Sequence, residues 1–121
     1  MTGATVLIVE DEDPIRLSLR DYLRRKGYQV LVASEGVGAI KQLLDNSVDV
    51  IITDYRMEVL GGDYWLRFLQ RFCGAQEIIL TSGFLKTDRL LPYPVVYKPY
   101  DYGELAQLIE QRLTERKARG G

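Results

Sequence analysis

Five short runs of apolar residues, rich in β-branched side chains, alternate with segments of helical periodicity, and this alternation constrains the fold more than any other feature. The runs occupy residues 6–9, 28–33, 50–53, 78–81 and 95–97. The first, third and fourth are almost continuously apolar, which is typical of strands covered on both faces, whereas the second alternates and suits a position nearer an edge. The order predicts an α/β fold, with a parallel sheet between two layers of helices.

Helical patterns fill the gaps between these runs. Asp13–Pro14 is typical of a helix start, with Asp13 as the N-cap and the proline in the first turn, and Gly27 ends that helix. Further helices are expected over about 38–45, from about Asp63, and over about 102–116. Each of the four predicted helices has one apolar face, which we expect to be buried. In chain order these faces are formed by Ile15, Leu19, Tyr22 and Leu23; by Ile40, Leu43 and Leu44; by Trp65, Leu66, Leu69 and Phe72; and by Leu105, Leu108, Ile109 and Leu113.

The connection between the fourth and fifth runs is too short for a full helix. Only residues 83–94 lie between them, and two loops of ~2–6 residues each would leave one or two helical turns. Pro92 and Pro94 shorten this space further. We therefore expect a stub or a loop where the alternation calls for a helix.

Length and composition indicate one soluble domain. The chain has 121 residues, for which we expect a core over about 5–114 and a polar tail over 115–121, frayed from Arg116 onward. Its 16 Lys and Arg nearly balance its 17 Asp and Glu, which gives no sign of direct binding to nucleic acid. No apolar run approaches the ~20 residues of a membrane span, and no leader pattern opens the chain. We expect a cytoplasmic protein.

The absence of histidine restricts the chemistry. With no histidine and a single cysteine, Cys73, the sequence excludes zinc sites of the common kinds, serine triads, disulfides and a phosphohistidine within this chain. A buried, small apolar role is expected for Cys73. Catalysis here must use carboxylates, a hydroxyl or an amine.

Polar side chains follow the predicted strands at their carboxyl ends. Glu10, Asp11 and Glu12 follow the first run, Asp54 the third, Thr81 and Ser82 end the fourth, and Lys98 follows the fifth. Taken singly, such residues are more often caps, turn residues or solvated charges; for Glu12 and Asp13 that remains the favoured interpretation. Their convergence at one edge of a parallel sheet instead predicts a shared site.

These residue types suit phosphoryl transfer. Crowded carboxylates repel one another and therefore take up protons or bind a cation, and oxygen ligands favour Mg²⁺. A carboxylate beside Mg²⁺ can attack phosphorus and form an aspartyl phosphate. A lysine and a hydroxyl would then help to neutralise the phosphoryl oxygens.

Four short strings together resemble the bacterial response-regulator receiver family. They are LIVEDE at 7–12, ITDYRM at 52–57, ILTSG at 79–83 and KPY at 98–100, and the resemblance runs over about 6–113. It implies a flavodoxin-like, doubly wound, five-stranded parallel sheet of order 2-1-3-4-5, here with the fourth helix shortened or missing.

The resemblance also implies a role for each site residue. Asp54 would be the phosphoacceptor, assisted by Lys98 and by the Ser82 hydroxyl, with Thr81 as the alternative. Mg²⁺ would be held by Asp11 and Asp54, by Glu10 through a water, and by the backbone carbonyl of Arg56. The Lys98–Pro99 peptide bond would be cis and would aim the lysine.

Four positions depart from the family pattern. Glu10 stands where a second aspartate is frequent, and Glu58 where proline is usual. The Arg56 side chain either reaches over the site or is solvated. Val95 replaces the aromatic residue that couples phosphorylation to output, so the chemistry is better supported than a standard switch.

The leading hypothesis is a phosphoacceptor module of a two-component phosphorelay, with slow autodephosphorylation and no enzymatic turnover. Its partners would be a histidine kinase or a histidine phosphotransfer protein and an unidentified downstream target; a homodimer is left open. The first alternative is a pseudo-receiver that acts as an interaction module. An aspartate-nucleophile phosphatase is more remote, because Arg56 stands where such enzymes have a second aspartate.

Overall fold

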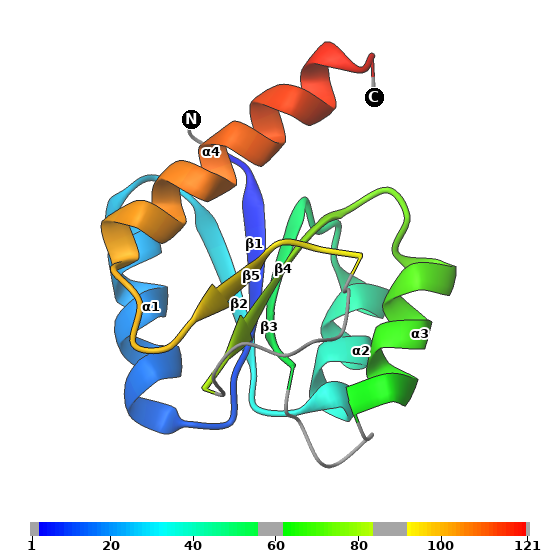
Figure 1. Ribbon diagram of the computed structural model, residues 1–121, viewed down its shortest axis with the longest axis horizontal. Coiled ribbons are helices and arrows are strands. Elements are labelled where there is room, and N and C mark those ends of the chain that lie inside the picture. The colour runs from blue at the N-terminus through cyan, green and yellow to red at the C-terminus, as the bar shows by residue number, and fades with distance from the viewer. Residues whose placement is uncertain (1–2, 56–61, 84–91, 121) are drawn as a thin grey trace.

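The computed structural model describes residues 3–55, 62–83 and 92–120, with the side chains of Gly62 and Asp63 left aside. Its centre is one parallel sheet of order β2-β1-β3-β4-β5, as the resemblance implied (Figure 1). The sequence placed all five strands within one residue at each end, and β2 lies at an edge as expected. The strands are β1 Thr5–Val9, β2 Gln29–Ala33, β3 Val50–Asp54, β4 Glu77–Ser82 and β5 Val95–Tyr97.

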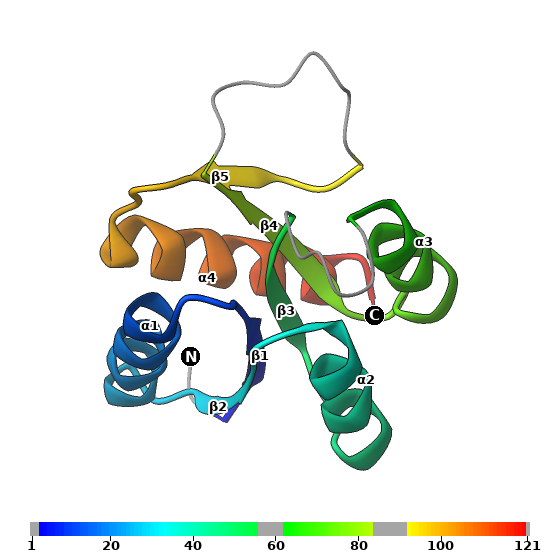
Figure 2. The ribbon, with the colours of Figure 1, turned by 90° about the horizontal axis from the view of Figure 1, so that it is seen from below.

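Helices cover both faces of the sheet, which confirms the doubly wound α/β fold (Figure 2). They are α1 Asp13–Arg25, α2 Gly36–Asp45, α3 Gly62–Phe72 and α4 Tyr102–Ala118. Between β4 and β5, the described residues, Gly83 and 92–94, contain no helix. The predicted stub falls largely on 84–91, which lie outside the described residues. Within the described ranges, no helix is long and apolar enough to cross a membrane.

Strand alternation divides the interior into two cores. Consecutive side chains of β1 point to opposite faces of the sheet, so Val6 and Ile8 pack beneath α1 and α4, and Leu7 and Val9 beneath α2 and α3. All four are at most 1% exposed, as expected for a central strand of a parallel sheet.

Two helix faces differ from the sequence prediction. Leu44 is 80% exposed, because Gly36 and Ala39 face the sheet and Leu44 is rotated beyond that contact. Phe72 is 65% exposed, because Cys73 takes the core position one turn after Leu69. The predictions that these two side chains belong to the core were therefore wrong.

The start of α1 and the end of α4 also differ from the sequence prediction. Asp13 is the first residue of α1 rather than its N-cap, and Glu12 takes the cap position without a side-chain bond to the helix. The Asp13 carboxylate instead accepts a bond from Arg16 at 2.6 Å. The expectation of a frayed tail from Arg116 was wrong, because α4 continues to Ala118.

Arginines in the last turns of α4, and Arg119 directly after it, explain that extension. Arg112 Nε lies 3.1 Å from Oε1 of Glu77, and Arg119 Nη2 lies 3.0 Å from Oε2 of the same carboxylate. Arg116 Nη2 lies 3.0 Å from Asp49 Oδ1. Glu77 is 6% exposed, so these ion pairs compensate for the burial of its carboxylate, and they hold the last turns of α4 against the amino ends of the strands.

Side chains from the flanking helices bind the outer backbone of β2. Arg24 Nη2 of α1 donates to the Val30 carbonyl at 3.2 Å, and Gln42 Nε2 of α2 donates to the Val32 carbonyl at 3.2 Å. The edge strand therefore has bonded carbonyls on the side that faces away from β1.

Cys73 is buried, as predicted, and burial raises the pKa of its thiol. At pH 7.5 we expect a thiol reagent to modify the native protein roughly 100-fold more slowly than the urea-unfolded protein, because access requires a local opening. Stopped-flow absorbance with an aromatic disulfide measures both rates. Equal rates in the two states would contradict the buried position of the thiol.

Candidate functional site

The carboxyl ends of four strands bring the predicted site residues together. Glu10 follows β1, Asp54 ends β3 and Lys98 follows β5, while β4 ends with Thr81 and Ser82. Asp54 pairs with Thr81 in the sheet, and the Lys98 backbone N–H donates to the Ser82 carbonyl at 2.7 Å. Because parallel strands end at a common edge, residues distant in sequence become neighbours there.

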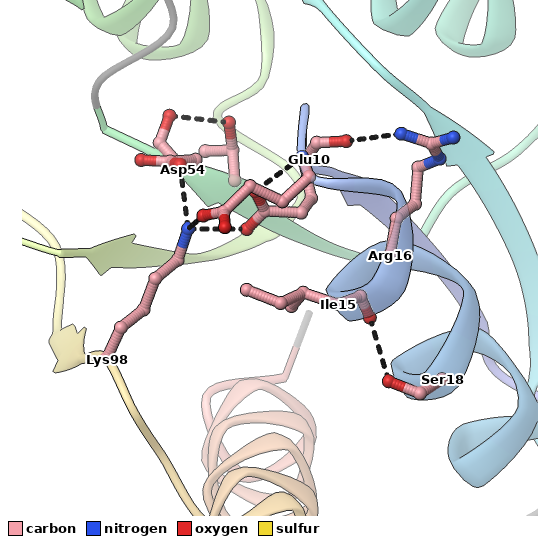
Figure 3. A network of polar contacts seen from close by, with 8 residues as sticks. Glu10, Ile15, Arg16, Ser18, Asp54 and Lys98 are labelled. Atoms are coloured by element: carbon pink, nitrogen blue, oxygen red, sulfur yellow. Dashed lines mark hydrogen bonds and ion pairs between the residues drawn. The ribbon is translucent and has the colours of Figure 1, made fainter.

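Lys98 lies at the centre of the cluster and contacts three carboxylates (Figure 3). Its Nζ is 2.8 Å from Glu10 Oε1, 2.9 Å from Asp54 Oδ2 and 3.1 Å from Glu12 Oε2. The Glu10 and Asp54 side chains are almost fully buried, whereas that of Glu12 is exposed. The Lys98–Pro99 peptide bond is cis, as the resemblance implied.

Four carboxylates meet closely enough to share one cation. Glu10, Asp11, Glu12 and Asp54 each offer an oxygen, and these oxygens lie within 4.8 Å of one another. An all-oxygen donor set that is partly buried and partly open to water fits Mg²⁺, which keeps several of its waters. Glu12, which the sequence favoured as a cap or turn residue, therefore takes the N-cap position and also joins the cluster.

The loop after β1 is held by its own polar groups. The Glu12 backbone N–H donates to Glu10 Oε2 at 3.0 Å, while Glu10 Oε1 contacts Lys98, so both oxygens of this carboxylate are bound. Arg16 Nη1 donates to the Glu10 backbone carbonyl at 2.9 Å (Figure 3). The sequence analysis did not single out Arg16. The available signal was its position, since it is a cation in the first turn of a helix that directly follows three acidic residues.

Burial and the charges within the cluster shift two pKa values. Burial raises the pKa of Glu10, and the nearby Asp54 charge acts in the same direction. Burial alone would lower the pKa of Lys98, but hydrogen bonds to Glu10, Asp54 and Glu12 outweigh it and raise that pKa. The lysine is therefore charged at neutral pH.

Of the remaining site predictions, some concern described residues and others fall outside them. Thr81 and Ser82 are both buried at the end of β4, and the choice between their hydroxyls stays a prediction. Val95 packs against the core beneath α2 and α3. Arg56 and Glu58 lie outside the described residues, so the predicted carbonyl ligand and the Arg56 side chain stay predictions.

Residues 6–91 match the response regulator receiver domain family. The chain belongs to this family. That span includes the carboxyl ends of β1, β3 and β4, and therefore Glu10, Asp54, Thr81 and Ser82. Lys98 lies beyond it.

The curated relatives that match this chain are longer than it. Sensor kinase CckA of Brucella abortus is 31% identical over 122 residues, which cover 94% of this chain and 13% of CckA. The transcriptional regulatory protein KdpE of Mycobacterium tuberculosis is 33% identical over 85 residues, which cover 70% of this chain and 38% of KdpE. The chain thus spans only a minor part of either relative.

Solved structures support the same architecture. A response regulator receiver domain protein from Clostridium thermocellum superposes with a TM-score of 0.84 at 25% identity, covering 95% of this chain and 98% of the other. The response regulator TrrA from Thermotoga maritima superposes with a TM-score of 0.78 at 24% identity, covering 89% and 97%. At that identity the second match concerns the fold alone.

Replacing Glu10 with glutamine should change the pH dependence of stability. The folded pKa of Glu10 is raised above its ordinary 4.5, so the folded receiver domain takes up this proton more readily than the unfolded chain. The contribution of Glu10 to wild-type stability should therefore fall as the pH rises from its ordinary pKa of 4.5 to its raised folded pKa. The Glu10→Gln variant lacks this ionisable group, so its stability relative to that of wild type should rise from pH 4 upward and then level off.

Urea unfolding with a chelator present measures this effect across the pH series. A difference between the two proteins that is constant with pH would contradict the raised pKa.

Proposed function

We propose that this chain is a phosphoacceptor module of a two-component phosphorelay, with Asp54 as the acceptor. The observation that carries the proposal is the position of Asp54 at the end of β3, where its Oδ2 lies 2.9 Å from Lys98 and its carboxylate belongs to the four-acid cluster. Such a cluster beside one lysine suits an acceptor that must handle additional negative charge. Membership of the receiver family supports the same assignment.

The donor set of the cluster indicates which residues would hold Mg²⁺. Asp11 and Asp54 would bind it directly and Glu10 through a water, with the Arg56 backbone carbonyl as a further ligand. When bound, the ion would neutralise carboxylate and phosphoryl oxygens that otherwise repel each other. The TrrA structure is a complex with Mg²⁺ and a beryllium fluoride, which agrees with such a site in a protein of this fold.

The side chains of this chain perform the transfer. An Asp54 carboxylate oxygen attacks the phosphorus of a phosphohistidine, the new O–P bond forms, and the N–P bond breaks with its electron pair leaving on the imidazole. Lys98 exchanges a carboxylate contact for a phosphoryl oxygen, and the Ser82 hydroxyl, or that of Thr81, donates to another. Water later cleaves the acyl phosphate slowly, so the module does not turn over as an enzyme does.

The partners follow from the chemistry. Since the sequence holds no histidine, the phosphohistidine must come from a histidine kinase or a phosphotransfer protein. The downstream target is then a protein that distinguishes the phosphorylated module from the unphosphorylated one.

Intact-mass spectrometry after incubation with acetyl phosphate and Mg²⁺ tests the proposal. Wild type should gain one phosphoryl group, and Asp54→Asn should gain none. Asp49→Asn is the matched control, because it removes a carboxylate that is bound by Arg116 away from the site, and it should still be labelled. Labelling of Asp54→Asn would contradict the assignment of Asp54 as the acceptor. If neither acetyl phosphate nor a phosphorylated kinase labels any of the three proteins, the result would favour the pseudo-receiver.

A further inference from the structure

The outer surface of α3 carries exposed aromatic rings flanked by arginines. Tyr64 is 72% exposed and Phe72 is 65% exposed. Arg67 and Arg71 are exposed beside them, and Phe68 is half-buried between them. We call this surface, made of Tyr64, Arg67, Phe68, Arg71 and Phe72, the aromatic–arginine face.

Spacing along the helix produces two parallel rows. Tyr64, Phe68 and Phe72 recur every four residues and share one side of α3, and Arg67 and Arg71 form the adjacent row. The Arg67 guanidinium carbon lies 5.8 Å from the Tyr64 ring centroid, and that of Arg71 lies 5.4 Å from the Phe72 centroid. Together with Gln70, these residues line a shallow groove.

The exposed ring of Phe72 is connected to the buried core through Phe68. Phe68 stacks on Trp65, with centroids 5.6 Å apart and an interplanar angle of 9°, and Phe72 lies 5.1 Å from Phe68. Trp65 itself is 2% exposed. The Phe72 ring therefore packs against Phe68, and a side chain that is already packed before binding loses less entropy when a partner contacts it.

The composition of this face matches that of binding surfaces. Tyrosine, phenylalanine and arginine are enriched at the centres of protein interfaces, and tyrosine and arginine are enriched among the residues that dominate binding energy. Two rings left in water also make an apolar patch larger than a single stray side chain.

Charge indicates the partner. The described groove-lining residues include two cations and no carboxylate, so a segment with carboxylates beside an apolar side chain would complement it. Two arginines could neutralise only a few phosphates, and nucleic-acid affinity depends largely on the number of phosphates that are neutralised, so charge favours a protein segment. A two-fold contact with a second copy would bring the same arginines together.

We propose that the aromatic–arginine face of α3 docks an acidic, amphipathic segment of a partner protein. The apolar side chain of that segment lies against Phe72 and Tyr64, and its carboxylates pair with Arg67 and Arg71. The face contains none of the four cluster carboxylates and not Lys98, so docking is a function beyond phosphoacceptance and persists in Asp54→Asn.

Selection from a phage-displayed library of random peptides tests this proposal. Wild type and the Arg67→Glu/Arg71→Glu double variant serve as parallel baits. The Lys41→Glu/Lys117→Glu double variant is the matched control, since it makes the same charge change at exposed positions of α2 and α4. Wild type and control should enrich peptides that combine acidic and apolar residues, and the α3 double variant should not.

Fluorescence anisotropy with the best-enriched peptide then measures affinity. Both the α3 double variant and Phe72→Ala should weaken binding roughly tenfold or more, whereas the control double variant and Asp54→Asn should not change it. Circular dichroism confirms that each variant is folded.

Three results would overturn the proposal. One is no enrichment on wild type, or enriched peptides that bind all baits alike. A second is tighter binding of a single-stranded oligonucleotide that also depends on Arg67 and Arg71. The third is a concentration-dependent dimer in sedimentation that Phe72→Ala abolishes, which would assign the face to a second copy of this chain.

Discussion

Trp65→Ala should lower the free energy of unfolding by about 3–5 kcal/mol, which is the usual range for truncation of a buried tryptophan. Trp65 is 2% exposed, and its Nε1 donates to Thr53 Oγ1 at 2.8 Å in the core. The substitution therefore leaves a cavity and also removes a partner of a buried hydroxyl. Urea unfolding followed by circular dichroism measures the loss.

Two companion variants separate these effects. Trp65→Phe keeps much of the ring but loses the donor, so it should fall between wild type and Trp65→Ala. Phe72→Ala, on the exposed side of the same helix, should cost less than about 1 kcal/mol. A loss from Trp65→Ala no larger than that from Phe72→Ala would show that Trp65 is not a core residue.

Lys98→Met should destabilise the metal-free protein by about 3–5 kcal/mol at pH 8, the range found when one partner of a buried ion pair is removed. The substitution keeps most of the side-chain length but removes the ammonium that contacts Glu10, Glu12 and Asp54. The buried carboxylates of Glu10 and Asp54 then repel each other without that compensating charge. Chelator-treated protein and urea unfolding provide the measurement.

The loss should shrink as the pH is lowered to 5, because burial raises the pKa of Glu10 and its protonation removes the repulsion between the two side chains. Lys41→Met, at an exposed position of α2, is the control and should stay within about 0.5 kcal/mol of wild type. An equal effect of the two substitutions, or an effect of Lys98→Met that does not change with pH, would argue against the central position of Lys98.

The sequence predicted the sheet and the meeting of the site residues because both depend on local signals. Each strand is a short apolar run, and the polar residue after it lies at the sheet edge wherever the helices pack. Strand order alone thus predicts that one edge of the sheet carries Asp54, Lys98, Glu10 and Asp11.

Contacts between distant segments account for the errors. Leu44 and Phe72 satisfy helical spacing, but which side of a helix meets the sheet is decided by packing against residues elsewhere in the chain. The end of α4 was placed too early because Glu77, a partner of Arg119, is 42 residues away in sequence. Nothing in a run of charged residues at a chain end indicates such a partner.

The bonded carbonyls of Val30 and Val32 have a consequence for how these molecules meet one another. An uncovered edge strand is a template onto which a strand of another molecule can add, and long edges of that kind lead to aggregation. Arg24 and Gln42 already occupy two of the acceptors that an incoming strand would need. A strand of another molecule could pair with β2 only by displacing both side chains, so this edge of the sheet resists edge-to-edge association.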